Sequence, residues 1–250
     1  MKQINSIDKV IAILGNIILE SENNKNPLGY FAALYQKVTI RVKEGIENNF
    51  FDDGPRMEKL DVVFANRYID AYYSYQENEA IPASWNRAFG LSTNYWPIVL
   101  QHLLIGMNAH LSLDLGIAAA EISRNRNIDD LENDFNKINE VLSTLVSDVD
   151  HDLAKIWPTL KILLKLAGKV DDFLVDFSMG LARDGAWKFA KSIANKPYNN
   201  LDSLIEKRDQ KVARKAKIIT NLGIIARTIL MIIRLGERGS VSKRIEELKN

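Results

Sequence analysis

The sequence predicts an all-α fold: a single-domain, multi-helix bundle of residues 1–250 around a buried central helix at about 96–124. Apolar residues recur at helical spacing along almost the whole chain, whereas the alternation typical of strands is hard to find. The segment 98–120 contains no Lys, Arg or Glu. A helix that is apolar nearly all round belongs in a core. At 250 residues and 46% hydrophobic residues, the chain can bury a core of that kind.

Caps and loop residues delimit the first three predicted helices. Ser6 is a suitable N-cap for a helix that ends near residue 20, and a second helix is predicted at about 28–47. The sequence DDGP at 52–55 breaks the chain before a third helix at about 56–76. The early apolar run is short and lacks a small-residue cleavage site, which favours an ordinary first helix over a signal peptide. We therefore expect a cytoplasmic protein, although the absence of cysteine is compatible with export.

Prolines and short polar segments mark the boundaries of the remaining predicted helices. Pro82 opens a short helix that carries Trp85 and Phe89, and a polar turn at 92–94 leads into the central helix. Further helices are predicted at about 130–147, 159–169, 171–195 and 201–235, with a short amphipathic tail at 241–248. No repeat with the period of a solenoid is present.

Composition excludes several classes of function. The formal net charge is +1, so there is no overall field for nucleic acid, and we expect no nucleic-acid partner. Without cysteine there are no disulfides, thiolate nucleophiles or cysteine-bound metals. Phosphate-binding glycine loops and the GxSxG nucleophile motif are also absent. Segment 98–120 is long enough to cross a bilayer, but its central polar residues would be costly there, so we expect no transmembrane span.

The C-terminal fifth of the chain is basic. Residues 201–250 carry a formal charge of +6, which leaves about −5 for the rest. A cluster of Lys and Arg at 207–217 precedes a very apolar stretch at 218–235. Such a helix could contact anionic lipid or a partner. The interpretation we favour is a solvated face on a helix whose second half is buried.

The polar residues of the central helix are the best candidates for a site. His102, Gly106, His110 and Asp114 follow each other at a spacing of four, which places them along one stripe of a helix. His110 and Asp114 are neighbours on this stripe and could bind one metal ion together. His102 lies about 12 Å further along a straight helix, too far to share that ion unless the helix is distorted near Gly106.

A metal site would need ligands from elsewhere in the chain. Asp61 is the best donor on another helix because its neighbours are apolar, and His151 is the best donor near a helix end. A set of His110, Asp114, Asp61 and His151 would suit Zn²⁺, Mn²⁺ or non-haem iron. The spacing is a weak signal, since neither HExxH nor a Glu-x-x-His pair is present.

Two interpretations without a metal stand beside this one. In an acid/base site, His110 or His102 is the general base, Asp61 or Asp114 orients it, and Arg67 binds an anionic group of a small-molecule ligand. In a purely structural network, His110 bonds a carbonyl and Asp114 pairs with Arg67, and these contacts fix the register of the helices.

Three stretches resemble a bacterial family catalogued as a domain of unknown function. They are RMEKLDVVFANRYIDA at 56–71, WNRAF at 85–89 and QHLLIGMNAHLSLDLGIAAA at 101–120. The resemblance covers residues 28–120 well and the C-terminal half loosely. It implies a helical fold and no particular reaction. Its signature residues are Arg56, Asp61, Asn66, Arg67, His102, Asn108, His110 and Asp114.

The leading hypothesis is therefore a small-molecule enzyme with a buried His/Asp site, metal-dependent in one form. Its candidate catalytic residues are His110, His102, Asp61 and Arg67. The alternative is a non-enzymatic helical scaffold or binding module, in which the same residues only fix helix packing and the basic C-terminal helix contacts a partner or a membrane surface. The sequence does not predict the oligomeric state.

Overall fold

Caps set the helix boundaries in the N-terminal half of the computed structural model. The structure describes residues 4–138, 140–141, 152, 155–157, 179–197, 200–220 and 223–250. Helix α1 (Ile7–Asn23) begins at Ser6, whose side chain accepts a hydrogen bond from the Lys9 N–H. After α2 (Leu28–Glu47), helix α3 (Gly54–Gln76) begins at Asp53, which caps it in the same way. Throughout the described residues the regular elements are helices, which confirms the predicted all-α class.

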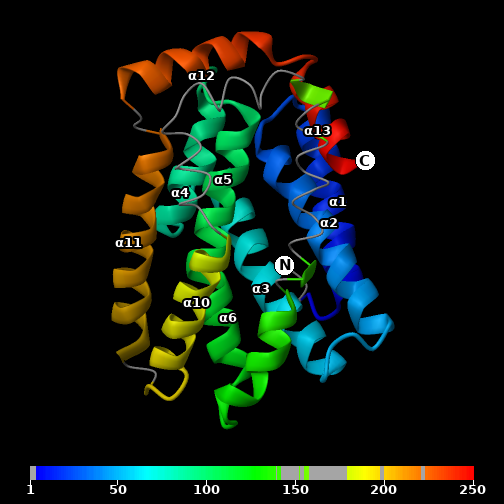
Figure 1. Ribbon diagram of the computed structural model, residues 1–250, viewed down its shortest axis with the longest axis vertical. Coiled ribbons are helices and arrows are strands. Elements are labelled where there is room, and N and C mark those ends of the chain that lie inside the picture. The colour runs from blue at the N-terminus through cyan, green and yellow to red at the C-terminus, as the bar shows by residue number, and fades with distance from the viewer. Residues whose placement is uncertain are drawn as a thin grey trace.

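The predicted central helix is confirmed. It consists of α5 (Val99–Ala109), a π-helical turn η2 (His110–Asp114) and α6 (Leu115–Ile122). This run of 24 residues is long and apolar enough to cross a membrane, but its most apolar stretch is 94% buried by the other helices. Figure 1 shows α1, α2 and α13 (Val241–Lys249) on one side of it, and α10 (Met179–Ile193) and α11 (Leu201–Thr220) on the other.

Two buried carboxylates cap helices from a distance. Asp134 accepts hydrogen bonds from the N–H groups of Asp52 and Asp53, at 2.7 and 2.9 Å, just before α3. Asp209 of α11 accepts from Ala83 and Ser84, at 2.6 and 2.9 Å, where α4 (Ala83–Gly90) begins. The first N–H groups of a helix lack partners within it, so the bonds from Ala83 and Ser84 fix where α4 starts, whereas Asp134 holds the backbone that leads into α3.

The chain from 201 to 235 forms two helices rather than the one we predicted. Helix α11 ends at Thr220, and α12 (Ile224–Gly236) begins after Gly223. Gly223 has an extended backbone (φ −56°, ψ 165°), which ends the helical path. In Figure 1, α12 lies across the end of the bundle at a steep angle to α11. The expectation that this half is buried is wrong for its outward side, where Ile224, Ile232 and Leu235 are exposed.

Gly106 allows α2 to approach the central helix closely. A Cβ at this position would lie 2.4 Å from the ring of Phe31. We expect Gly106→Ala to lower the free energy of unfolding by about 1–3 kcal/mol, because Phe31 or the backbone would have to shift. The measurement is urea unfolding followed by circular dichroism.

Gly90→Ala provides the matched control. Gly90 lies in helical conformation at the end of α4, and a Cβ there meets no atom within 4 Å. We expect this change to be neutral or stabilising by up to about 1 kcal/mol. Equal effects of the two substitutions would contradict the proposed contact between Gly106 and Phe31.

Candidate functional site

The candidate site lies where the central helix departs from α-helical geometry. The sequence points to Gly106 as the place for a distortion of the central helix, but the π turn comes one turn later and contains His110 and Asp114 themselves. A π turn disturbs the regular ladder of backbone hydrogen bonds. Arg208 of α11 compensates by donating from Nε to the Ser112 carbonyl at 2.8 Å. One turn before, the Asn108 side chain donates to the Val212 carbonyl at 3.1 Å, so α11 binds both the turn and the helix just before it.

Asp114 accepts hydrogen bonds from three side chains on three elements. Its Oδ1 accepts from Arg67 Nε of α3 at 2.9 Å. Its Oδ2 accepts from Trp85 Nε1 of α4 at 2.8 Å and lies 3.1 Å from His110 Nδ1. The carboxylate is fully buried. The pairing of Asp114 with Arg67 was one of the two contacts expected of a structural network, whereas the role of Trp85 as a donor was not predicted.

Burial and neighbouring groups shift the pKa values of Asp114 and His110. Burial alone would raise the pKa of Asp114, but Arg67 and the hydrogen bonds from His110 and Trp85 outweigh it, and the pKa lies below its usual value. Burial lowers the pKa of His110, and Asp114 only partly offsets this effect. We conclude that Asp114 is ionised and His110 is neutral near pH 7. The His110 proton is then on Nδ1, where it bonds Asp114, and Nε2 carries a free lone pair.

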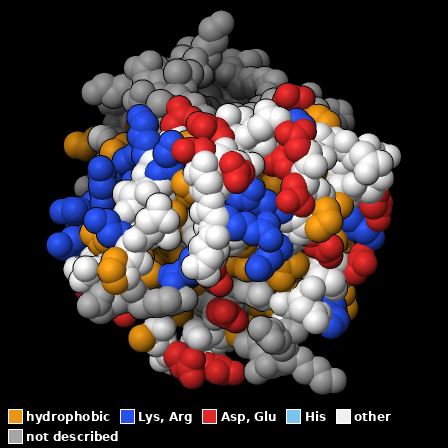
Figure 2. Space-filling model, turned by 90° about the horizontal axis from the view of Figure 1, so that it is seen from below, with side chains coloured by type: hydrophobic (Ala, Val, Ile, Leu, Met, Phe, Trp, Pro, Cys, Tyr) orange, Lys and Arg blue, Asp and Glu red, His pale blue; other side chains and the backbone are white. Residues whose placement is uncertain are grey.

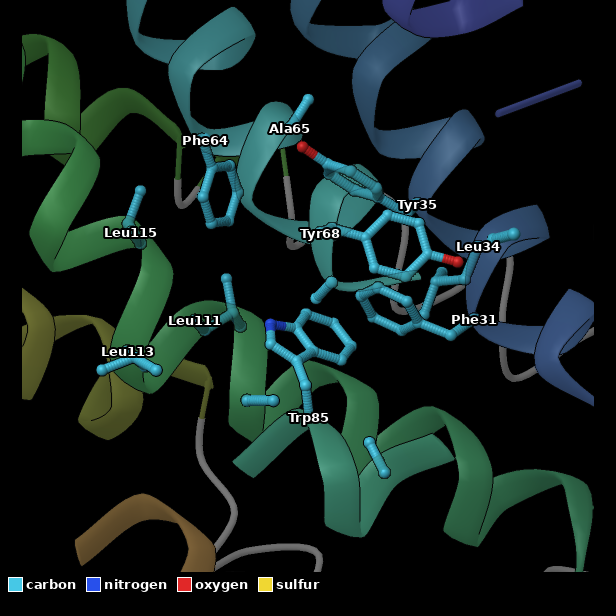
Figure 3. Packing of buried hydrophobic residues seen from close by; sticks show 14 of the residues in the cluster. Phe31, Leu34, Tyr35, Phe64, Ala65, Tyr68, Trp85, Leu111, Leu113 and Leu115 are labelled. Carbon is cyan, nitrogen blue, oxygen red and sulfur yellow. The ribbon is translucent and has the colours of Figure 1, made fainter. Parts of the chain in front are cut away.

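Aromatic rings enclose His110. The ring of Phe64 stacks on the imidazole at a centroid distance of 3.6 Å, and Tyr35 meets it edge-on at 4.4 Å. Figure 3 shows Phe31 and Tyr35 of α2, Tyr68 of α3 and Trp85 of α4 converging on this part of the core. Among the described residues, His110 Nε2 has no hydrogen-bond partner in this enclosure, and neither do the hydroxyls of Tyr35 and Tyr68. A buried polar atom without a partner is rare in folded proteins and calls for an explanation.

Asp61 lies in the same interior region as His110. It comes one turn before Phe64 on α3, and it is buried with its Oδ2 lacking a hydrogen-bond partner. Burial, with a smaller contribution from Glu58, raises its pKa to about 8. Burial also raises the pKa of Tyr35, and the nearby carboxyls of Asp61 and Asp114 raise it further. Asp61 is therefore largely protonated at neutral pH, on the side of the core that contains His110.

The predicted metal ligands do not come together as one set. Asp114 and His110 bond each other, and Asp61 forms no hydrogen bond with either in the structure. His151 lies outside the described residues. In the part of the chain that the structure describes, no three His, Asp or Glu side chains are placed to hold a metal ion.

His102 belongs to a different cluster. Its ring meets Tyr30 edge-on at 5.4 Å, whereas the neighbouring Phe31 meets His110. Burial and the positive charge of Arg234 lower the pKa of His102 to about 3. In the same region Glu237 pairs with Arg234 at 2.6 Å and accepts from the Val99 N–H at 2.8 Å. His102 and His110 are thus separate, as their spacing on the helix predicted.

Comparison with known protein families gives a match over most of the chain. The family of unknown function DUF5995 matches residues 7–222. The chain belongs to this family. The match extends beyond the resemblance at 28–120 in both directions and ends before α12. No curated protein and no solved structure matches the chain.

The buried carboxyl of Asp61 makes stability depend on pH. Its folded pKa of about 8 lies above the ordinary 3.8, so the folded state binds more protons between these values. The contribution of Asp61 is complete below pH 3.8 and is lost as the pH rises towards 8. We expect Asp61→Asn to become more stable relative to wild type as pH rises from 5 to 8, by on the order of 3 kcal/mol.

The measurement is urea unfolding of both proteins at several pH values. Glu121→Gln removes an exposed carboxylate from α6 and serves as the control, for which we expect no such trend. A constant difference between Asp61→Asn and wild type across this range would show that Asp61 is ionised in the folded protein.

Proposed function

We propose that the protein is a small-molecule enzyme in which His110 acts as a general base without a metal. The observation that carries this proposal is the state of the imidazole. Nδ1 is held by the ionised Asp114, while Nε2 is buried and has no partner. A neutral histidine oriented through one nitrogen, with a lone pair on the other, is ready to accept a proton from a bound substrate.

The neighbouring groups define the class of substrate. Arg67 donates to Asp114, and 27% of its side chain is exposed, so it links the buried pair to solvent. Its remaining guanidinium N–H groups suit a carboxylate or phosphate. The substrate would be a small anion bound by these N–H groups while Arg67 Nε stays on Asp114. The neutral carboxyl of Asp61 would supply a proton on the same side.

A helical scaffold is the second candidate, and the enclosure of the pair supports it. His110 and Asp114 are 2% and 0% exposed. The hydrogen bonds of Asp114 join α3, α4 and the central helix, as a network that fixes helix register would do.

Two substitutions of His110 separate these candidates. His110→Asn keeps an amide N–H near the position of Nδ1 but has no counterpart of Nε2, whereas His110→Gln extends its amide towards the position of Nε2. An enzyme should lose its proton acceptor in both variants, and we expect kcat to fall by about 10²–10⁴-fold. A scaffold should tolerate Asn better, because the bond to Asp114 survives.

The experiment begins with a panel of small carboxylates and phosphate monoesters. Ligands are identified by thermal shift of the wild-type protein, and the two His110 variants are then compared by ligand affinity, turnover measured by mass spectrometry, and melting temperature. Arg67→Lys keeps the charge but not the fork of N–H groups, so we expect weaker ligand binding in that variant. The enzyme proposal fails if no compound binds, or if turnover persists in both His110 variants.

Metal dependence requires its own measurement. The alternative in which His110, Asp114, Asp61 and His151 hold Zn²⁺, Mn²⁺ or iron predicts near-stoichiometric metal by elemental mass spectrometry and a lower melting temperature after chelation. We expect no such metal, because both oxygens of Asp114 already accept hydrogen bonds and His110 Nδ1 carries a proton. Stoichiometric metal that is lost in His110→Asn and His151→Ala would contradict the metal-free proposal.

A further inference from the structure

Exposed apolar side chains gather at the end of the bundle that α12 covers. Among the described residues, two of the large exposed hydrophobics lie on α1 and α2, namely Leu19 and Ile40. The others are Tyr95, Trp96, Ile218, Ile224, Ile232 and Leu235, which lie on α12, on the last turn of α11 and on the loop before α5. Arg234 ties this loop to α12, because it donates to the Tyr95 carbonyl at 2.5 Å and lies over the Tyr95 ring.

Helix α12 is apolar on both of its faces. Ala226, Leu230 and Ile233 are buried against the bundle. On the outward face, Ile224, Ile232 and Leu235 are 86%, 51% and 69% exposed. A surface helix ordinarily turns polar residues to solvent. From Ile224 to Leu235 this apolar ridge extends about 17 Å along the helix, with the exposed Thr228 between its members.

The chain around this ridge is basic. Between residues 210 and 236 there are six Lys or Arg and no Asp or Glu. Lys211, Arg214, Lys215, Lys217 and Arg227 are exposed, and none of them pairs with a carboxylate of the described residues. Arg234 is the exception, since it is buried and paired with Glu237. The cations that remain free lie on α11 and α12.

The opposite end of the bundle is different. Figure 2 views that end, and there hydrophobic side chains are visible only as separate spots, although Lys and Arg also gather on the left of the view. Among the described residues, the apolar ridge and the exposed Trp–Tyr pair occur together with unpaired cations at the α12 end. Trp96 and Tyr95 are in edge-on contact at 5.4 Å. Such rings favour the boundary between lipid headgroups and acyl chains.

We propose that the α12 end of the bundle binds the surface of a bilayer that contains anionic lipids. Ile224, Ile232 and Leu235 would enter the boundary between headgroups and acyl chains, with Trp96 and Tyr95 beside them. Lys217 and Arg227 would meet lipid phosphates, and the other free cations of α11 would add a longer-range attraction. The complementary charge selects this occupant over a neutral bilayer. The contact is peripheral and needs no helix to leave the core.

Vesicle flotation with the full-length protein tests this proposal. Vesicles of phosphatidylcholine alone are compared with vesicles of phosphatidylcholine and phosphatidylglycerol. We expect binding to the mixed vesicles that weakens as salt is raised. The double variant Ile224→Glu, Leu235→Glu should bind at least about tenfold more weakly. Ile40→Glu, which places the same charge on an exposed apolar site of α2, should bind like wild type.

A second pair of variants tests the cations without touching the ridge. Lys217→Gln with Arg227→Gln should weaken binding to the mixed vesicles by about tenfold. Lys59→Gln with Lys188→Gln removes two exposed cations from α3 and α10 and should have no comparable effect. Melting temperatures show that each variant is folded.

Three results would overturn the proposal. Wild-type protein that fails to float with the mixed vesicles would do so, as would an equal loss in Ile40→Glu and in the ridge variant. The third is a dimer, measured by light scattering, that the ridge variant converts to monomer while vesicle binding is absent. That outcome would show that the exposed face of α12 binds a second copy of the chain instead of a bilayer.

Discussion

The burial of Asp114 constrains much of the surrounding structure. A carboxylate with no exposure is stable only if each of its oxygens is hydrogen-bonded and a positive charge is close. Arg67 and Trp85 meet this requirement together with His110, and each reaches Asp114 from a different element. Those elements are themselves held by carboxylates, because Asp209 caps the helix that carries Trp85 and Asp134 binds the backbone just before the helix that carries Arg67.

The π turn connects this polar network to the packing of the whole central helix. An extra residue in one turn rotates the following helix by about 100° relative to an uninterrupted α-helix. Before the turn, Gly106 lies against Phe31 of α2. After it, Gly116 lies against α10, where a Cβ would be 2.8 Å from the Ala186 carbonyl. Within the turn, the Ser112 carbonyl accepts a hydrogen bond from Arg208, so the turn depends on α11 as well.

Local sequence was sufficient to predict the central helix and to place His110 and Asp114 next to each other on it, because both follow from composition and a spacing of four. The contact between Arg67 and Asp114 was anticipated only as one of several alternatives, since it depends on how two helices pack. Trp85 could not be identified as a donor, and neither could the cap from Asp209, because the bonded groups are 29 and 125 positions apart. The prediction of one continuous helix at 201–235 failed for a different reason. The apolar pattern continues through Gly223, and only the backbone shows that the chain turns there and exposes one side of α12.

Two buried polar atoms near Phe64, His110 Nε2 and Asp61 Oδ2, have no partner among the described residues, and they help to decide whether the network around Asp114 is only structural. A network that merely fixes helix register gains nothing from His110 Nε2 or from the free oxygen of Asp61, and each buried atom without a partner costs about 1–3 kcal/mol. A smaller side chain that donates to Asp114 would preserve the network without the cost of Nε2. The fold instead keeps a neutral imidazole and a neutral carboxyl in one region of the core, both with unused hydrogen-bonding capacity. Two such groups of complementary chemistry are expected where a substrate completes the hydrogen bonds, which is the strongest argument that this region of the core performs chemistry.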